Sequence, residues 1–280
     1  MTRVLHKIVF ACSAVSALIV VCLATTQAQV RYATGQNVAP VFEGWERNAD
    51  GSFTFVFGYM NRNYEEEVDV PVGAANFLEP GQQDQNQPSH FYPRRQQFVF
   101  KVRVPKDWGK KDLIWTLTSH GKTEKAYASL MPVWEIDSGT YQQNRGGPGE
   151  LGELDDPPAI KLSGAAERSI AIADTLTLST TVADDGRPTA RRSGSGSNPR
   201  VEGPLKQAVV RLDPDMRLGV IWIVYRGNAA AVTFNPRKVK VVNGKADTVV
   251  RFSAPGTYVL RGYADDGIFW DAVDVTAVVR

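Results

Sequence analysis

Acid–base or metal chemistry in this chain would have to be built around two histidines. Beyond residue 28 the histidines are His90, in the Gln- and Pro-rich segment 82–93, and His120, in a predicted hairpin turn. The sequence has no His-x-x-x-His or Cys-x-x-Cys spacing of a transition-metal site and no Gly-x-Ser-x-Gly nucleophile elbow. We interpret both as solvated loop histidines. A hydrolase with its site at the His90 loop is kept as an alternative, because triad residues can be distant in sequence.

No cofactor is expected. Residues 147–152 match the pattern Gly-x-Gly-x-x-Gly, which binds a dinucleotide by placing its pyrophosphate at a helix N-terminus. Asp-Asp-Pro-Pro at 155–158 follows in place of a helix. The match is therefore interpreted as part of a flexible segment.

Two aspartate pairs supply the oxygen ligands that a calcium ion would need. Asp184-Asp185 and Asp265-Asp266 each precede a glycine in a predicted loop. Calcium takes about six to eight oxygen ligands, many of them carboxylate. EF-hand spacing is absent and Asp-Asp-Gly is ordinary turn chemistry, which is the interpretation we favour. We expect no metal, and keep as calcium candidates Asp184, Asp185, Asp265 and Asp266.

Three aromatic residues fall at predicted loop tips. Trp108 lies in the turn at 106–110, and Phe269-Trp270 follows Asp-Asp-Gly near the tip of the last predicted hairpin. Exposed aromatic side chains at loop tips can stack on sugar rings or dock into a protein groove. Packing against a neighbouring domain is the interpretation we favour. The candidates for partner contact are Trp108, Phe269 and Trp270.

The first 28 residues have the pattern of an export signal. Arg3 and Lys7 precede an uncharged apolar run at 8–24, and residues 26–28 place small side chains at positions −3 and −1. We expect a signal peptide at 1–28 and an exported protein, periplasmic or at the cell surface. A retained N-terminal anchor is the alternative, because the run is near the lower limit for a membrane span.

Without this segment the chain is neutral and has no cysteine. The 32 basic and 30 acidic residues become 30 and 30 when Arg3 and Lys7 are removed, and Cys12 and Cys22 are lost with them. Disulfides and thiolate sites are then excluded. A neutral chain has no broad basic field, so we expect no nucleic-acid partner. Membrane contact is expected only through a retained N-terminal segment or a partner.

The elements that would position these residues are strands. Residues 44–60 have the pattern of a hairpin with a turn at 48–51. Period-two rows follow, and each is expected to share one face: Phe53, Phe55, Phe57 and Tyr59; Phe98, Phe100, Val102 and Val104; Leu113, Trp115 and Leu117. No helical periodicity of comparable length is present. Residues 38–137 are therefore predicted to form an antiparallel β-sandwich.

A predicted linker and a second β-rich segment follow. Residues 138–164 are rich in Gly, Pro and acidic residues and are predicted to be a linker. In the block 165–280, apolar residues alternate from Leu176 to Val182, and 220–225 is apolar on both faces, with Trp222 in the core. Residues 187–204 are rich in Arg, Ser, Gly and Pro and are predicted to be a loop insertion.

Several motifs of the second block resemble bacterial PKD-like and Ig-like repeat domains. They are LTLSTTVADDG at 176–186, Trp222, FSAPGTYVLR at 252–261, ADDG at 264–267 and DVTAVV at 274–279. The resemblance covers residues 176–280 and implies a seven-strand sandwich used for spacing and contact, without catalytic residues. Tyr258 follows a Pro-Gly turn, where its hydroxyl can bond nearby backbone in a tyrosine corner. Residues 38–137 resemble no family that their motifs identify.

Together these features predict an all-β fold of two antiparallel Ig-like β-sandwich domains. We expect a non-enzymatic structural or interaction protein of the bacterial envelope with protein partners, for example an extrinsic subunit that scaffolds a membrane-associated complex. The first alternative is a carbohydrate-binding module that uses Trp108 or Trp270 to contact a glycan. The second is the hydrolase with its site in residues 38–137.

Overall fold

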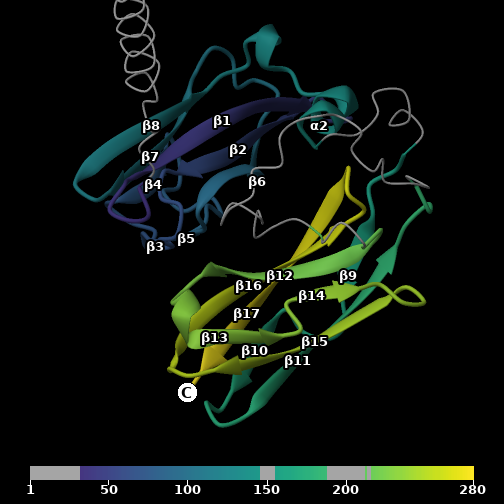
Figure 1. The fold of residues 1–280 in the computed structure, drawn as a ribbon. Helices are drawn as coiled ribbons and strands as arrows, with labels where there is room; N and C mark the ends of the chain where they lie inside the picture. The colour runs from purple at the N-terminus through teal and green to yellow at the C-terminus, as the bar shows by residue number, and fades with distance from the viewer. Residues whose placement is uncertain (1–31, 146–154, 188–211, 213–215) are drawn as a thin grey trace, which may run out of the picture. The chain divides into compact units, whose positions relative to one another are not determined.

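Strands dominate the computed structural model, which describes residues 32–145, 155–187, 212 and 216–280 (Figure 1). The predicted signal peptide and nearly all of the predicted insertion at 187–204 lie outside the described residues. Residues 33–280 form one compact unit. The described part also contains α2 (Ser138–Arg145) and the 3-10 turns η1 (Pro132–Trp134) and η3 (Ala229–Ala231). The predicted all-β fold is confirmed.

The first sandwich consists of two three-stranded antiparallel sheets and a short ribbon. One sheet has the order β1-β2-β6 and the other β4-β7-β8, and β3 pairs with β5. The bounds are β1 (Val38–Arg47), β2 (Phe53–Asn61), β3 (Val68–Asp69), β4 (Asn76–Glu79), β5 (His90–Phe91), β6 (Arg94–Val104), β7 (Leu113–Ser119) and β8 (Lys122–Ala128). The predicted β1–β2 hairpin is confirmed, with Asp50 accepting a hydrogen bond from the Ser52 amide across its turn.

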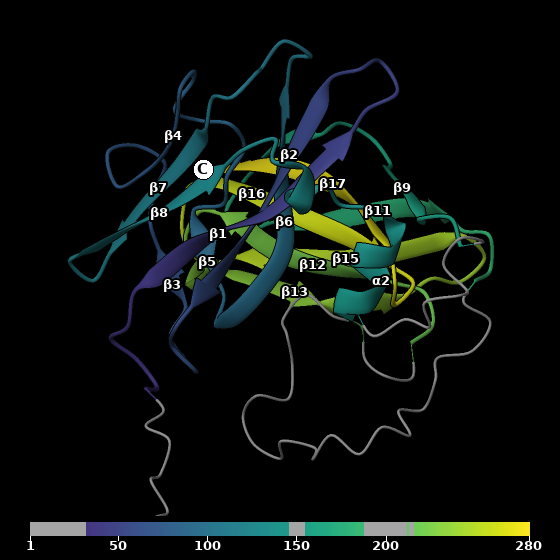
Figure 2. The ribbon, with the colours of Figure 1, turned by 90° about the horizontal axis from the view of Figure 1, so that it is seen from above.

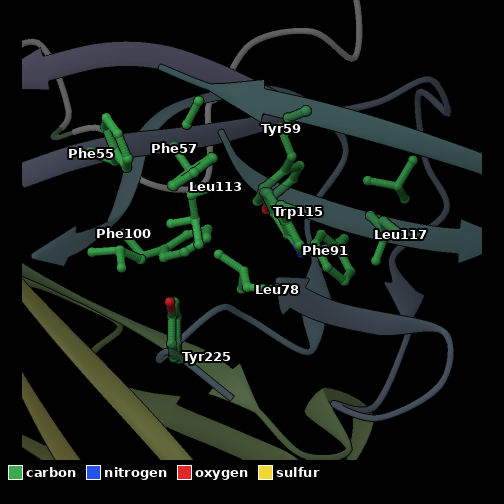
Figure 3. Close-up of a cluster of buried hydrophobic side chains, with 14 of the residues drawn as sticks. Phe55, Phe57, Tyr59, Leu78, Phe91, Phe100, Leu113, Trp115, Leu117 and Tyr225 are labelled. Carbon is green, nitrogen blue, oxygen red and sulfur yellow. The ribbon is translucent and has the colours of Figure 1, made fainter. Parts of the chain in front are cut away.

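Aromatic side chains fill the space between these sheets (Figure 3). Phe57 stacks on Phe100 with 5.0 Å between ring centroids, and Trp115 meets Phe100 edge-on at 4.9 Å. The Trp115 Nε1 donates to Asn76 Oδ1 at 2.9 Å, so its polar atom is satisfied inside the core. The inward row predicted on β7 is confirmed, because Leu113, Trp115 and Leu117 are all buried.

A bulge in β6 overturns one predicted face. Phe57 pairs with Phe100 and Tyr59 with Gln96, so three residues of β6 stand opposite Gly58 alone. Phe98 adopts a positive φ of 55° within the bulge. The extra residues break the period of two, and Phe98 leaves the face of Phe100 and joins a separate cluster on the other side of the sheet. The prediction that Phe98 shares the inward face was wrong for this reason.

The second sandwich has the strand order of an Ig domain. One sheet runs β10-β17-β16-β12-β14 and the other β13-β15-β11-β9. The bounds are β9 (Ala159–Leu162), β10 (Glu167–Ile170), β11 (Thr175–Ala183), β12 (Gly219–Arg226), β13 (Val232–Asn235), β14 (Lys238–Lys240), β15 (Lys245–Phe252), β16 (Gly256–Asp265) and β17 (Trp270–Val279). With β9 and β10 as the two halves of a split first strand, these are the A-B-E-D and G-F-C-C′ sheets. The described residues thus form more strands than the seven implied by the resemblance.

Two predicted core features of this sandwich are confirmed. Trp222 is fully buried, and the Tyr258 hydroxyl donates to the Ala254 carbonyl at 2.9 Å, as a tyrosine corner requires. Gly262 of β16 faces the Trp222 indole so closely that a Cβ would lie 2.9 Å from its Cζ2. Trp222 therefore fits in this core because residue 262 has no side chain.

The first sandwich covers an open edge of β12. Strand β14 pairs with β12 only over Gly219–Ile221, which leaves the remainder of that edge without a strand neighbour. There the Tyr92 hydroxyl accepts from the Val224 amide at 3.0 Å and donates to the Val224 carbonyl at 3.3 Å. The Ser89 amide donates to the Tyr225 carbonyl at 3.1 Å. One loop of the first sandwich thus satisfies backbone groups that an edge strand otherwise leaves unpaired.

The segment predicted to be a linker contains regular structure. Helix α2 places Tyr141 against Phe98, with 4.7 Å between ring centroids, and β9 pairs with β11. Figures 1 and 2 both show α2 beside the β16–β17 turn. No helix among the described residues is long and apolar enough to cross a membrane.

Gly262→Ala is expected to destabilise the protein. The new methyl group would overlap the buried Trp222 ring, and overpacking of this kind costs about 1–3 kcal/mol. Urea unfolding followed by circular dichroism measures the loss. Gly139→Ala in α2 is the control, because its Cβ would meet no atom closer than 3.4 Å. Equal stability of Gly262→Ala and wild type would contradict this packing.

Tyr92→Phe tests the covered edge of β12. The substitution removes one hydroxyl and leaves the buried amide and carbonyl of Val224 without partners, so a loss of about 2 kcal/mol or more in unfolding free energy is expected. The same urea titration measures it. Tyr127→Phe is the matched control, because Tyr127 is 55% exposed. Similar small effects of both substitutions would show that the Tyr92 hydroxyl does not stabilise this edge.

Candidate functional site

A cleft between the two sandwiches is lined by two of the predicted site residues, Phe269 and Trp270. Its volume is about 550 Å³, and its walls include Phe98, Tyr141 and Trp270 together with the carboxyl groups of Asp155 and Asp271. Arg261 fixes one wall, because it pairs with both carboxylate oxygens of Asp274 and donates to the Val99 carbonyl of the β6 bulge at 2.9 Å. The cleft thus combines aromatic surfaces with acidic oxygens.

The β16–β17 turn inserts its aromatic tip into the first sandwich. Phe269 is 7% exposed and belongs to a buried cluster with Val56, Phe98, Ile136, Tyr141 and Ile268. Trp270 is half-buried, with its ring centroid 5.7 Å from that of Phe98 and 5.3 Å from that of Tyr141. The contact made by Phe269 and Trp270 is therefore with a neighbouring part of the same chain, which was the favoured interpretation.

Trp108 lies in the core of the first sandwich and not at a surface. It is 8% exposed, its ring meets Phe55 edge-on at 5.9 Å, and its Nε1 donates to the Lys111 carbonyl at 2.7 Å. A tryptophan enclosed in this way presents no ring face for a sugar. The structure therefore gives Trp108 a packing role.

Each of the four candidate calcium ligands makes a local turn bond. Asp184 accepts from the Gly186 amide at 3.0 Å and Asp265 from the Gly267 amide at 2.6 Å. Asp185 accepts from the Arg187 amide, and Asp266 from the amides of Ile268 and Phe269. This is the turn chemistry that the Asp-Asp-Gly sequences favoured. Among the residues that the structure describes, no group of three or more His, Cys, Asp or Glu side chains could hold a metal ion.

Asp155 is the residue that the sequence reasoning missed. It is 6% exposed, and the next residue, Asp156, donates its amide to Asp185 Oδ2 at 3.3 Å. Burial, reinforced by the nearby Asp185 and Asp184, raises the pKa of Asp155 to about 6. Burial also raises the pKa of Asp266 to about 7, with Asp155 adding to the effect. Asp155 is therefore electrostatically coupled to residues of both acidic pairs, which the sequence placed in separate loops.

The sequence does contain an indication of Asp155, but the segment around it was predicted to be a linker. Asp155-Asp156 is a third Asp-Asp pair, and the two prolines after it suggested irregular chain. Only the fold shows that these prolines lead directly into β9 beside β11.

His90 is enclosed in the first sandwich, contrary to the expected solvated loop. It is 4% exposed and lies in β5, which pairs with β3. Its Nδ1 lies 2.7 Å from Asp69 Oδ1 and its Nε2 lies 2.9 Å from Glu67 Oε2. Carboxylates engage both ring nitrogens, so neither is open to activate a nucleophile. His120 lies in the predicted β7–β8 turn, with its Nε2 3.0 Å from Glu66 Oε1.

The pair of carboxylates makes His90 a source of pH-dependent stability. Burial disfavours the imidazolium, but the hydrogen bonds that its N–H groups donate to Asp69 and Glu67 outweigh burial and raise the pKa of His90 above its ordinary 6.5. The stabilisation is therefore complete below about pH 6.5 and is lost as the pH rises through the folded-state pKa. His90→Gln is expected to flatten this decline in urea-derived stability, whereas the control His120→Gln retains it. An unchanged profile for His90→Gln would contradict the assignment.

Comparisons with known proteins give a likeness in structure only. No family model matches the sequence, and no curated protein matches it. A chimeric titin Z1Z2 functionalized with a KLER exogenous peptide from decorin is 10% identical, with a TM-score of 0.27, covering 45% of this chain and 97% of that chain. Domains 4 and 5 of the S-layer protein SbsC are 9% identical, with a TM-score of 0.25, covering 61% and 65%. Sidekick-1 immunoglobulin domains 1–4 are 10% identical, with a TM-score of 0.25, covering 88% and 51%. At these identities and scores, nothing about the function of this chain follows from them.

Proposed function

We propose that the protein is a non-enzymatic structural or interaction protein of the bacterial envelope, an extrinsic subunit that contacts a protein partner of a membrane-associated complex. The observation that carries this proposal is an exposed apolar segment on the first sandwich. Met131, Val133 and Trp134 are 56%, 78% and 47% exposed within four residues of chain. Large apolar side chains gathered at a surface are a feature of protein contact sites.

The backbone of this segment is held in place while its side chains face outward. Trp45 Nε1 donates to the Met131 carbonyl at 2.9 Å, and the Ile136 amide donates to the Trp45 carbonyl at 2.8 Å. Trp134 also contacts Phe42, with 6.0 Å between ring centroids. An apolar surface that is already ordered loses little conformational entropy on binding, which favours a partner contact.

Two further features support the same proposal. The export-signal pattern at 1–28 directs the chain to the envelope, and the PKD-like motifs at 176–280 are those of domains used for spacing and contact. Burial of Trp108 and Phe269 leaves a glycan-binding alternative resting on Trp270 alone. The carboxylates on both nitrogens of His90 weaken the hydrolase alternative.

Native extraction of the envelope tests the proposal. Gentle detergent extraction, native size separation and mass spectrometry are applied to wild type, to the double variant Val133→Ser/Trp134→Ser and to Val242→Ser. We expect wild type to co-migrate with a large defined assembly and the double variant to be released from it at an unchanged Tm. Val242→Ser, which alters a 59% exposed valine of the second sandwich, should stay in the assembly.

Two results would overturn this proposal. Migration of the wild-type chain alone would remove the scaffold role, and retention of the folded double variant would remove the segment at 131–134 as its contact. The N-terminal peptide in the same spectra distinguishes a cleaved signal from a retained anchor.

A further inference from the structure

The cleft between the two sandwiches has an aromatic wall that is built from three elements. Phe98 comes from the bulge of β6, Tyr141 from α2 and Trp270 from the start of β17. The ring centroid of Phe98 lies 4.7 Å from that of Tyr141 and 5.7 Å from that of Trp270, and the last two lie 5.3 Å apart. The three rings therefore form one apolar surface. A cleft of about 550 Å³ with such a wall has the size and character of a small-molecule site.

Carboxylates from three segments line the same cleft. Asp137 precedes α2, Asp155 precedes β9 and Asp271 lies in β17. Asp137 and Asp271 are exposed, whereas Asp155 is 6% exposed. The salt bridges among the described residues include none to these three carboxylates. The cleft thus carries negative charge on its exposed rim and in its buried part.

The two described basic side chains that line the cleft already have carboxylate partners. Lys101 Nζ lies 2.9 Å from both carboxylate oxygens of Glu46. Arg261 donates to both carboxylate oxygens of Asp274. Lys101 Nζ also lies 5.6 Å from the ring centroid of Tyr141, so the aromatic wall already attracts one cation. Since these pairs are neutral, the three remaining carboxylates give the cleft a net negative charge.

Asp155 is the carboxylate of this set that lacks a hydrogen-bond donor. Neither of its oxygens has a partner among the described residues, and Arg187 attracts the carboxylate without donating a hydrogen bond to it. A buried carboxylate without a partner is costly, and a cation that carries N–H groups would remove that cost. A metal ion does not fit here, because no group of three or more His, Cys, Asp or Glu side chains in the described part of the chain could hold one.

We propose that this cleft binds an aliphatic polyamine, a linear chain of methylene groups that carries two or more ammonium groups. Ammonium groups donate hydrogen bonds to carboxylates and are attracted to aromatic ring faces, while the methylene groups cover the apolar wall. Because the three carboxylates belong to separate segments, charges that are spaced along a chain match them better than a compact ion does. This inference is independent of the partner contact at 131–134.

Isothermal titration of the purified protein with spermidine tests the site. We expect one spermidine per wild-type chain, and binding weaker by about tenfold or more in Asp155→Asn and in Asp137→Asn, because each substitution removes a charge-assisted hydrogen bond. Neither substitution should lower Tm. Asp155 accepts no hydrogen bond that could be lost, and asparagine at position 137 can still accept from the Thr140 amide at the start of α2.

The matched control is Asp247→Asn, which removes the same charge from an exposed aspartate of β15 that does not line the cleft. This variant should keep the wild-type affinity. Octanediol, a neutral chain of the same length as spermidine, should not bind, and MgCl₂ at equal charge should not displace spermidine.

Four results would overturn the proposal. They are no binding of spermidine to wild type, wild-type affinity in the folded variants Asp155→Asn and Asp137→Asn, equal binding of octanediol, and displacement of spermidine by MgCl₂ at equal charge. Tighter binding of tetralysine than of spermidine would overturn a free polyamine as the occupant in favour of lysine side chains of a protein.

Discussion

The open edge of β12 is the constraint on which much of this structure depends. Its neighbour β14 ends early, so the backbone from Val224 onward needs other partners, and a single hydroxyl from Tyr92 serves both the amide and the carbonyl of that residue. Arg226 adds a bidentate pair with Asp84, whose pKa is lowered by those hydrogen bonds. The first sandwich thus takes the place of a strand along this part of β12.

The β6 bulge provides a second contact between the two sandwiches. By placing three residues opposite Gly58, it turns Phe98 away from its own core and presents the Val99 carbonyl to Arg261. Glu43 fills the space above Gly58 and accepts both guanidinium bonds from Arg95. Burial raises the pKa of Glu43, and the charge of Arg95 opposes that shift. A local irregularity of one strand therefore determines which side chains meet the β16–β17 turn.

Periodicity and turn chemistry in the sequence were sufficient to predict the strands and the tyrosine corner, because these depend on near neighbours in the chain, and the apolar run around Trp222 was sufficient to place it in the core. They were insufficient for Phe98, whose face depends on a register shift against another strand. The acidic residues were predicted only in part. Asp184 and Asp266 lie in recognisable turns, but Asp155 was assigned to a linker, and its burial depends on the fold. His90 was misjudged because its two carboxylate partners belong to a different strand and loop.

The contact between the two sandwiches also has a consequence for how such a chain can evolve. Repeat domains that make little contact with their neighbours can be duplicated, lost or exchanged one at a time, since each buries its own apolar side chains and pairs its own backbone groups. Here the aromatic tip at Phe269 and the backbone of Val224 are completed only by the first sandwich. A gene fragment that encoded one sandwich without the other would expose apolar side chains and unpaired backbone groups at the former contact. The two sandwiches are therefore expected to be inherited as a pair, and recombination between them should be selected against.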